Sequence, residues 1–145
     1  MKKEEIWNEI KKIFETPKRG IVSTAYGNVP HSRYMLLYND GENLYTKTRS
    51  ASVDVDKIEK NNLAYIILGY DAETESSYLE ILGETEVVME QDTIDWLWKR
   101  EDHQRFDLEE EEVLIVLKFK PKAIKLMNVN DEIDQPEVIE FNSNL

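Results

Sequence analysis

The spacing of hydrophobic positions changes along the chain, and each spacing predicts a different kind of element. Between residues 6 and 14, apolar side chains recur every three or four positions with Lys and Glu between them. This period predicts an amphipathic helix over 3–15, which Thr16-Pro17 ends. From Gly20 onward, apolar and polar residues alternate instead, which predicts strands over 20–25 and 30–38 joined by a turn at 26–28.

The rest of the chain continues as strands separated by turns and short helices. Gly83 interrupts a long predicted antiparallel strand over 78–89 and predicts a bulge there. The remaining predicted elements are, in order, a strand over 43–48, a short helix within 53–61, strands over 63–69 and 78–89, a helix from a capping Asp92 to about Arg100, and strands over 113–119 and 123–127 separated by Pro121.

This order of elements predicts a mainly β (α+β) fold. A small antiparallel barrel of six or seven strands with short helices at its ends accounts for all of them. We assign residues 1–127 to this domain. Residues 128–145 hold five acidic side chains and no basic one, so we expect an acidic C-terminal tail with one docking stretch at 138–141.

Charge and composition narrow the class of protein. The chain has 145 residues with 18 basic and 30 acidic side chains, a net charge of −12, which argues against binding to nucleic acid. Residues 1–60 hold 11 basic and 9 acidic side chains, so an anionic ligand should prefer this half. The chain contains no cysteine and no apolar stretch long enough for a membrane span, and we expect a cytoplasmic protein that does not associate with membranes.

The sequence lacks the motifs of several kinds of catalytic site, which excludes those sites. The five glycines are too dispersed for a Walker loop or a dinucleotide-binding fingerprint, and no Gly-x-Ser-x-Gly elbow occurs. The two histidines, His31 and His103, show no metal-ligand spacing, so we expect no metal site.

Two segments in the first half of the chain contain side chains that could bind an anion. Alternation on strand 30–38 places Arg33 on the same face as Met35, where the guanidinium either reaches water, pairs with an acid or binds an anion. The third strand ends in hydroxyl side chains around Arg49 and leads into a helix, which favours a phosphate site or, alternatively, an ordinary serine-rich loop with a helix cap. The hydroxyls in question belong to Thr46, Thr48, Ser50 and Ser52.

Short motifs in a fixed order give the chain a resemblance to a known family. They are Pro30-His-Ser-Arg-Tyr-Met35, Leu44-Tyr-Thr-Lys-Thr48, Ile58-Glu-Lys-Asn-Asn62, Leu82-Gly-Glu-Thr-Glu86, and Phe119-Lys-Pro121 ahead of Ile124-Lys-Leu126. Over about residues 5–127 the chain resembles the flavin-binding split barrels of pyridoxamine 5′-phosphate oxidase-like proteins, and within them the general stress protein 26 branch.

The resemblance implies a homodimer of six-stranded split barrels with flavin mononucleotide (FMN) in a cleft at the subunit interface. Carried over residue by residue, it implies that the flavin contacts three short stretches. These are Arg33, Tyr34, Met35 and Leu36 on one strand, Tyr45 and Thr46 on the next, and Thr48, Arg49, Ser50 and Ser52 in the loop that holds the phosphate.

One position departs from the family pattern. Family members place Ser-x-Lys at the start of the short helix, with the lysine on the phosphate, whereas this chain has Ser52-Val53-Asp54. A carboxylate cannot neutralise a phosphate, so FMN is expected to bind weakly or not at all unless another cation, such as Arg49, substitutes.

Two functions therefore stay open. The first is an FMN-dependent oxidoreductase of the stress-response type that acts on an unidentified small molecule. The second is a non-enzymatic split barrel that either stores or senses flavin or has lost the cofactor. Another planar ligand, such as haem or a deazaflavin, is a third and weaker alternative. For haem in particular, neither His31 nor His103 lies in a context that marks it as an axial ligand.

Overall fold

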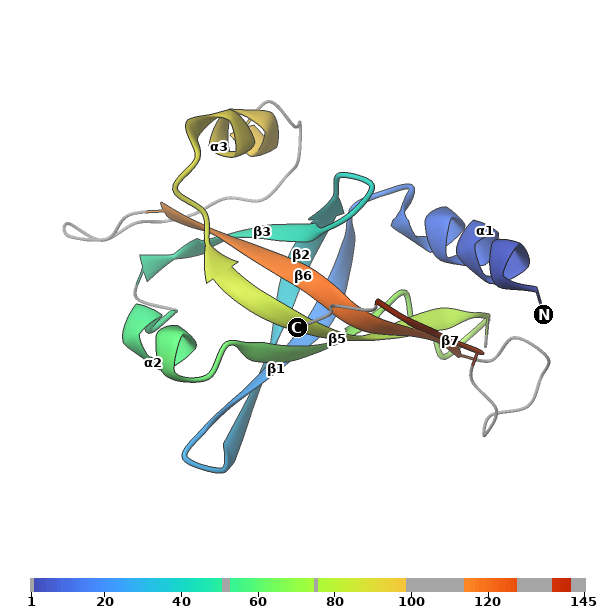
Figure 1. Ribbon diagram of the computed structural model, residues 1–145, viewed down its shortest axis with the longest axis horizontal. Coiled ribbons are helices and arrows are strands. Elements are labelled where there is room, and N and C mark those ends of the chain that lie inside the picture. Colours follow the sequence, from blue (N-terminus) through green and yellow to red (C-terminus); the bar gives the residue numbers. More distant parts are fainter. Residues whose placement is uncertain (1, 51–52, 75, 99–113, 128–136, 142–145) are drawn as a thin grey trace.

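The computed structural model describes residues 2–50, 53–74, 76–98, 114–127 and 137–141 and folds them into a barrel with peripheral helices (Figure 1). The elements are α1 (Lys3–Phe14), β1 (Lys18–Tyr26), β2 (Val29–Asn39), β3 (Leu44–Arg49), α2 (Val55–Lys60), β4 (Leu63–Leu68), β5 (Tyr78–Val87), α3 (Gln91–Trp98), β6 (Leu114–Met127) and β7 (Glu137–Glu140). None of these helices is long and apolar enough to cross a membrane.

Six of the strands close on themselves. All neighbours are antiparallel, in the order β3-β2-β1-β4-β5-β6, and β6 pairs with β3 to complete the ring. β7 adds to the outside of this ring by pairing with β6 through residues 137–140. The fold is therefore the mainly β, six-stranded antiparallel barrel that the sequence predicts, with one extra strand and three helices.

The β1–β2 hairpin has the turn that its sequence requires. Gly27 and Asn28 both have positive φ, 54° and 67°, which is typical of the tight two-residue turns that match strand twist. Glycine and asparagine tolerate this region better than other residues. The register that follows pairs Val22 with Arg33 and Gly20 with Met35.

The barrel interior is one hydrophobic core, and a second cluster lies outside it. Met35, Leu37 and Leu44 point inward, and Ile6 and Ile10 of α1 pack onto the same core. The second cluster forms where α3 covers the outer side of β2, β3 and β6, and it contains Tyr38, Tyr45, Leu97 and Val116. Each strand of the β2–β3 pair therefore buries side chains on both of its faces.

Two sequence predictions are wrong in detail. Pro121 does not separate two strands, because β6 runs unbroken from Leu114 to Met127. Proline fits there for two reasons. The β5–β6 register shifts between Leu82 and Gly83, which is the bulge predicted for Gly83. In addition, β6 pairs with β3 before Pro121 and with β7 after it. Asp92 does not cap α3; it lies inside the first turn of a helix that begins at Gln91.

Candidate functional site

An open cleft of about 490 Å³ lies between the tip of the β1–β2 hairpin and α2. The two elements lie at the same end of the barrel, opposite the end where α1 lies (Figure 1). They are joined by a hydrogen bond of 3.0 Å from Asn61 Nδ2 to the carbonyl oxygen of Ala25. The cleft is lined by Tyr26, His31, Arg33, Val53, Asp54, Val55, Asp56 and Lys57.

Arg33 reaches this cleft from the mouth of the barrel. The alternation predicted on β2 is confirmed, because Met35 and Leu37 on the same face as Arg33 belong to the interior core. The Arg33 side chain is half-buried and also lines a void of about 20 Å³ beneath the cleft, together with Met35 and Thr85. A cation thus stands where the apolar interior meets solvent, which suits recognition of an anion.

Asp54 provides the helix cap that sequence analysis offered as the alternative to a phosphate site, although it did not assign that cap to Asp54. Its carboxylate caps α2 by accepting a hydrogen bond of 3.2 Å from the backbone N–H of Lys57. Aspartate is among the best residues for this position because its charge also complements the helix dipole. One of the N–H groups at the start of α2 is therefore satisfied by the chain itself.

Lys57 lies one helical turn beyond Asp54 and lines the same cleft. Its ammonium group lies 5.0 Å from the centroid of the Tyr26 ring, a cation–π contact. The Tyr26 ring in turn lies against His31, with centroids 5.3 Å apart. Sequence analysis did not single out Lys57; the available signal was its i+3 spacing from Asp54, which places both residues on one helix face.

The other predicted site residues divide between the two faces of β2 and β3. Leu36 packs against the outer cluster, with Tyr45 at the centre of that cluster, so these two residues lie on the opposite side of the sheet from Met35. Tyr34 shares the outer face and is 74% exposed.

The predicted hydroxyl side chains differ in accessibility. Thr46 and Thr48 are buried, and Thr46 Oγ1 donates a hydrogen bond of 2.8 Å to the carbonyl oxygen of Leu36. Arg49 and Ser50 are half-buried at the end of β3. Ser52 lies outside the described residues.

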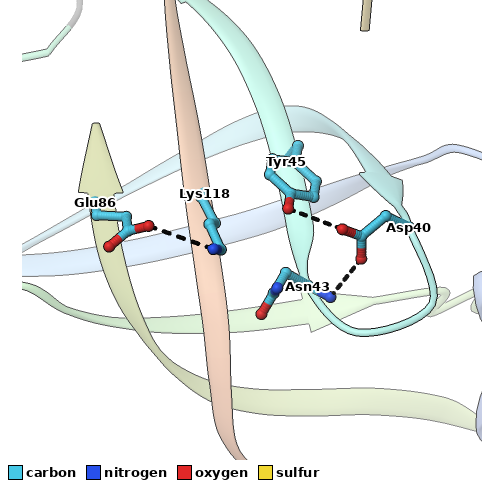
Figure 2. A network of polar contacts seen from close by, with 5 residues as sticks. All are labelled: Asp40, Asn43, Tyr45, Glu86 and Lys118. Carbon is cyan, nitrogen blue, oxygen red and sulfur yellow. Dashed lines mark hydrogen bonds and ion pairs between the residues drawn. The ribbon is translucent and has the colours of Figure 1, made fainter. Parts of the chain in front are cut away.

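Tyr45 is the predicted site residue whose hydroxyl and ring both have partners within the chain. Its hydroxyl donates a hydrogen bond of 2.8 Å to Asp40, whose carboxylate also accepts the backbone N–H of Asn43 (Figure 2). Burial, with the hydrogen bond to Asp40 and its negative charge, raises the pKa of Tyr45 to about 12. For Asp40, burial raises the pKa, but the hydrogen bonds that its carboxylate accepts outweigh burial and lower it overall. Trp96 of α3 packs edge-on against the Tyr45 ring, with centroids 5.4 Å apart.

A second cation that sequence analysis missed lies on the outer face of β3. Lys47 is buried, only 8% exposed, and its ammonium group lies 5.4 Å from the centroid of the Tyr38 ring. On the neighbouring strand, Lys118 forms an ion pair of 3.4 Å with Glu86 (Figure 2). Within the described ranges, no three His, Asp or Glu side chains gather closely enough to hold a metal ion.

Comparison with known proteins gives concordant results. Over residues 6–128 the chain matches the protein family described as pyridoxamine 5′-phosphate oxidase. It is 29% identical over 133 residues to general stress protein 26 of Bacillus subtilis, covering 91% of this chain and 95% of that protein.

Solved structures share the fold. The crystal structure of general stress protein 26 from Bacillus anthracis superimposes with a TM-score of 0.74 at 24% identity, covering 94% of this chain and 99% of that one. A pyridoxamine 5′-phosphate oxidase-related, FMN-binding protein from Nostoc punctiforme superimposes with a TM-score of 0.62 at 11% identity, covering 97% of this chain and 96% of that one.

Proposed function

The chain belongs to the pyridoxamine 5′-phosphate oxidase family, and from this premise we propose that it is a cytoplasmic flavoprotein that binds FMN beside the mouth of its barrel. The observation that carries the proposal is the position of Arg33, half-buried between the apolar interior and an open cleft. The Nostoc punctiforme protein with the same fold, which is described as FMN-binding, supports the choice of ligand.

The residues present fit the two ends of FMN. The phosphate needs cations and hydrogen-bond donors, which Arg33 offers at the cleft and Arg49 and Ser50 offer at the end of β3. The ring needs flat apolar walls, which Tyr34 and Leu36 offer on the outer face of β2. When bound, the flavin would supply hydride or electron transfer, so the activity we propose is that of an oxidoreductase acting on a small molecule.

A homodimer is part of the same proposal. The outer sides of three adjacent strands carry an apolar row, in which Tyr34 is paired with Ile21 and Ile21 with Ile67. A second row pairs Tyr65 with Leu82 across β4 and β5. In the described part of the chain, these side chains belong to neither core cluster, which supports their burial by a second copy. Since Tyr34 is one of the proposed flavin residues, such an interface would adjoin the flavin site.

Flavin titration tests the binding. Purified protein should quench the fluorescence of FMN with an affinity in the low micromolar range. Arg33→Ala should weaken FMN about 10-fold or more, because the half-buried guanidinium makes a charge-assisted contact. Lys12→Ala on the exposed side of α1 is the matched control and should leave the affinity unchanged. Equal affinities for the two variants would contradict the placement of the site.

Size-exclusion chromatography with light scattering tests the dimer. The measured mass should be twice that of one chain. Ile21→Asp places a charge in the apolar row, so it should shift the measured mass toward that of the monomer. A wild-type monomer at the concentrations used for flavin binding would contradict the shared interface.

A second candidate function is a split barrel that binds flavin without catalysis or has lost the cofactor. The observation that favours it is Asp54, a carboxylate in the wall of the cleft. NADH or NADPH added without oxygen distinguishes the candidates: loss of the visible flavin absorbance supports the oxidoreductase, whereas a stable yellow complex supports the binding module.

A further inference from the structure

The cleft contains opposed charges, and its acids differ in their surroundings. Arg33 and Lys57 are basic, whereas Asp54 and Asp56 are acidic. Asp54 is engaged by the backbone of its own helix, since it accepts the N–H of Lys57 at 3.2 Å. Its carboxylate is thus directed toward the start of its own helix, whereas the exposed Asp56 makes no such cap among the described residues.

Lys57 is held at the cleft by an aromatic ring. Its ammonium group lies 5.0 Å from the Tyr26 centroid, and in the described part of the chain it forms no ion pair with a carboxylate. A cation over a ring keeps most of its charge available to an anion that approaches from the open side. The Tyr26 ring in turn contacts His31, and Tyr26 pairs with Val29 at the end of the β1–β2 hairpin.

Arg33 and Lys57 line the cleft from different elements. Arg33 projects from β2, at the mouth of the barrel, and Lys57 from α2, and the hydrogen bond from Asn61 to Ala25 fixes the two walls relative to each other. An anion that enters the cleft therefore meets a lining that contains both a guanidinium and an ammonium group. Such a pair recognises a phosphate monoester through both charge and hydrogen bonds.

We propose that Lys57, together with Arg33, binds the phosphate of FMN and gives the site its preference for FMN over unphosphorylated riboflavin. The proposal rests on the proposed function. Lys57 supplies from the last turn of α2 the positive charge that Asp54 does not supply from the helix start. This arrangement lets one residue, Asp54, cap the helix while a neighbour on the same face binds the ligand.

The test compares two lysines of the same helix. Lys57→Gln removes the cation from the cleft, and Lys60→Gln removes an exposed cation of α2 that does not line it. Each variant and the wild type are titrated with FMN and with riboflavin. We expect Lys57→Gln to weaken FMN about 5-fold or more and to leave riboflavin unchanged, whereas Lys60→Gln changes neither ligand by more than about 2-fold.

A third variant tests whether the loss of FMN affinity comes from the charge of Lys57 and not from a change in folding. Lys57→Arg keeps the charge and should retain FMN affinity within about 3-fold, and unfolding curves of all variants should coincide with that of the wild type. The proposal is overturned if Lys57→Gln and Lys60→Gln bind FMN equally, or if Lys57→Gln weakens FMN and riboflavin to the same extent. A wild-type protein that binds neither flavin would instead contradict the proposed function itself.

Discussion

The carboxylate of Asp54 accepts a hydrogen bond from the backbone N–H of Lys57, so the residue that departs from the family pattern caps the helix turn that carries a cation into the cleft. The acid at position 54 is thereby linked to the backbone geometry three residues later. The helix cap explains why an acid, Asp54, lies in a cleft that we assign to a phosphate. Its effect on FMN affinity can be measured separately from its effect on the stability of the helix.

Two substitutions of Asp54 separate these effects. Asp54→Asn keeps a good cap but removes the charge, so stability should stay within a few tenths of a kcal/mol while FMN binds about 2- to 5-fold more tightly. Asp54→Ala removes the cap as well and should lower the free energy of unfolding by about 1 kcal/mol. Urea denaturation and flavin titration measure the two quantities. Weaker FMN binding by Asp54→Asn would mean that the carboxylate assists the ligand.

The same substitution at two buried threonines should have opposite effects on stability. Thr46 donates its hydroxyl to Leu36, so Thr46→Val should lower the free energy of unfolding by about 1 kcal/mol. Thr85 Oγ1 is buried and, among the described residues, has no hydrogen-bond partner, so Thr85→Val should raise it by about 1 kcal/mol. Urea denaturation at neutral pH gives both values. Destabilisation by Thr85→Val would indicate a partner such as bound water in the adjoining void.

Tyr45→Phe should reveal a pH-dependent contribution to stability. At pH 7 the loss of the hydrogen bond to Asp40 should cost about 1–2 kcal/mol. The folded-state pKa of Tyr45 is raised to about 12, above an unfolded value of about 10. The hydroxyl therefore contributes fully below about pH 10, and its contribution is lost as the pH rises toward 12. Denaturation curves at pH 7, 10 and 11 should show the difference from the wild type narrowing, and a constant difference would contradict this assignment.

Acid pH affects the same pair through Asp40. Its folded-state pKa lies below the usual value, so its contribution to stability is present above about pH 4 and is lost as the pH falls through the folded pKa. Asp40→Asn should remove this part of the acid dependence. Denaturation midpoints of the variant and the wild type, measured from pH 6 to pH 3, should therefore converge at the acid end, and parallel curves would count against the shift.

Arg49 tests the contribution of β3 to the flavin site. Its side chain is half-buried at the end of the strand, on the outer face that also carries Lys47. Arg49→Ala should weaken FMN more than riboflavin if the guanidinium contacts the phosphate. Flavin titration of Arg49→Ala beside Arg33→Ala ranks the two contacts, and equal losses for both ligands would contradict a phosphate role for Arg49.

Local patterns predicted most of the fold. The Gly27 turn, the bulge at Gly83 and the opposite faces of β2 were all readable, because they depend on φ preferences and on a period of two residues. The sequence does not predict that β6 continues through Pro121, because a proline is tolerated there only through the partners of β6, which change from β3 to β7 around it. Partner changes of this kind arise from the fold and leave no local signal.

The candidate site was less predictable for the same reason. Arg33 could be placed on the core-facing side of its strand, yet the cleft needs α2 to lie against the hairpin, a contact made by Asn61 and Ala25 across 36 positions of sequence. Lys57 lines the cleft only because that contact brings α2 against the hairpin. The family resemblance implies that Tyr45 contacts the flavin, but the sequence does not predict that α3 packs over its ring or that its hydroxyl donates to Asp40.

The most direct measurement is the ratio of the dissociation constants of FMN and riboflavin for the wild-type protein, obtained by fluorescence titration under one buffer condition. Phosphate recognition by Arg33 and Lys57 predicts low-micromolar binding of FMN, at least 10-fold tighter than that of riboflavin. Equal affinities for the two flavins, or no binding of FMN at near-millimolar concentration, would contradict a phosphate-binding cleft at the mouth of this barrel.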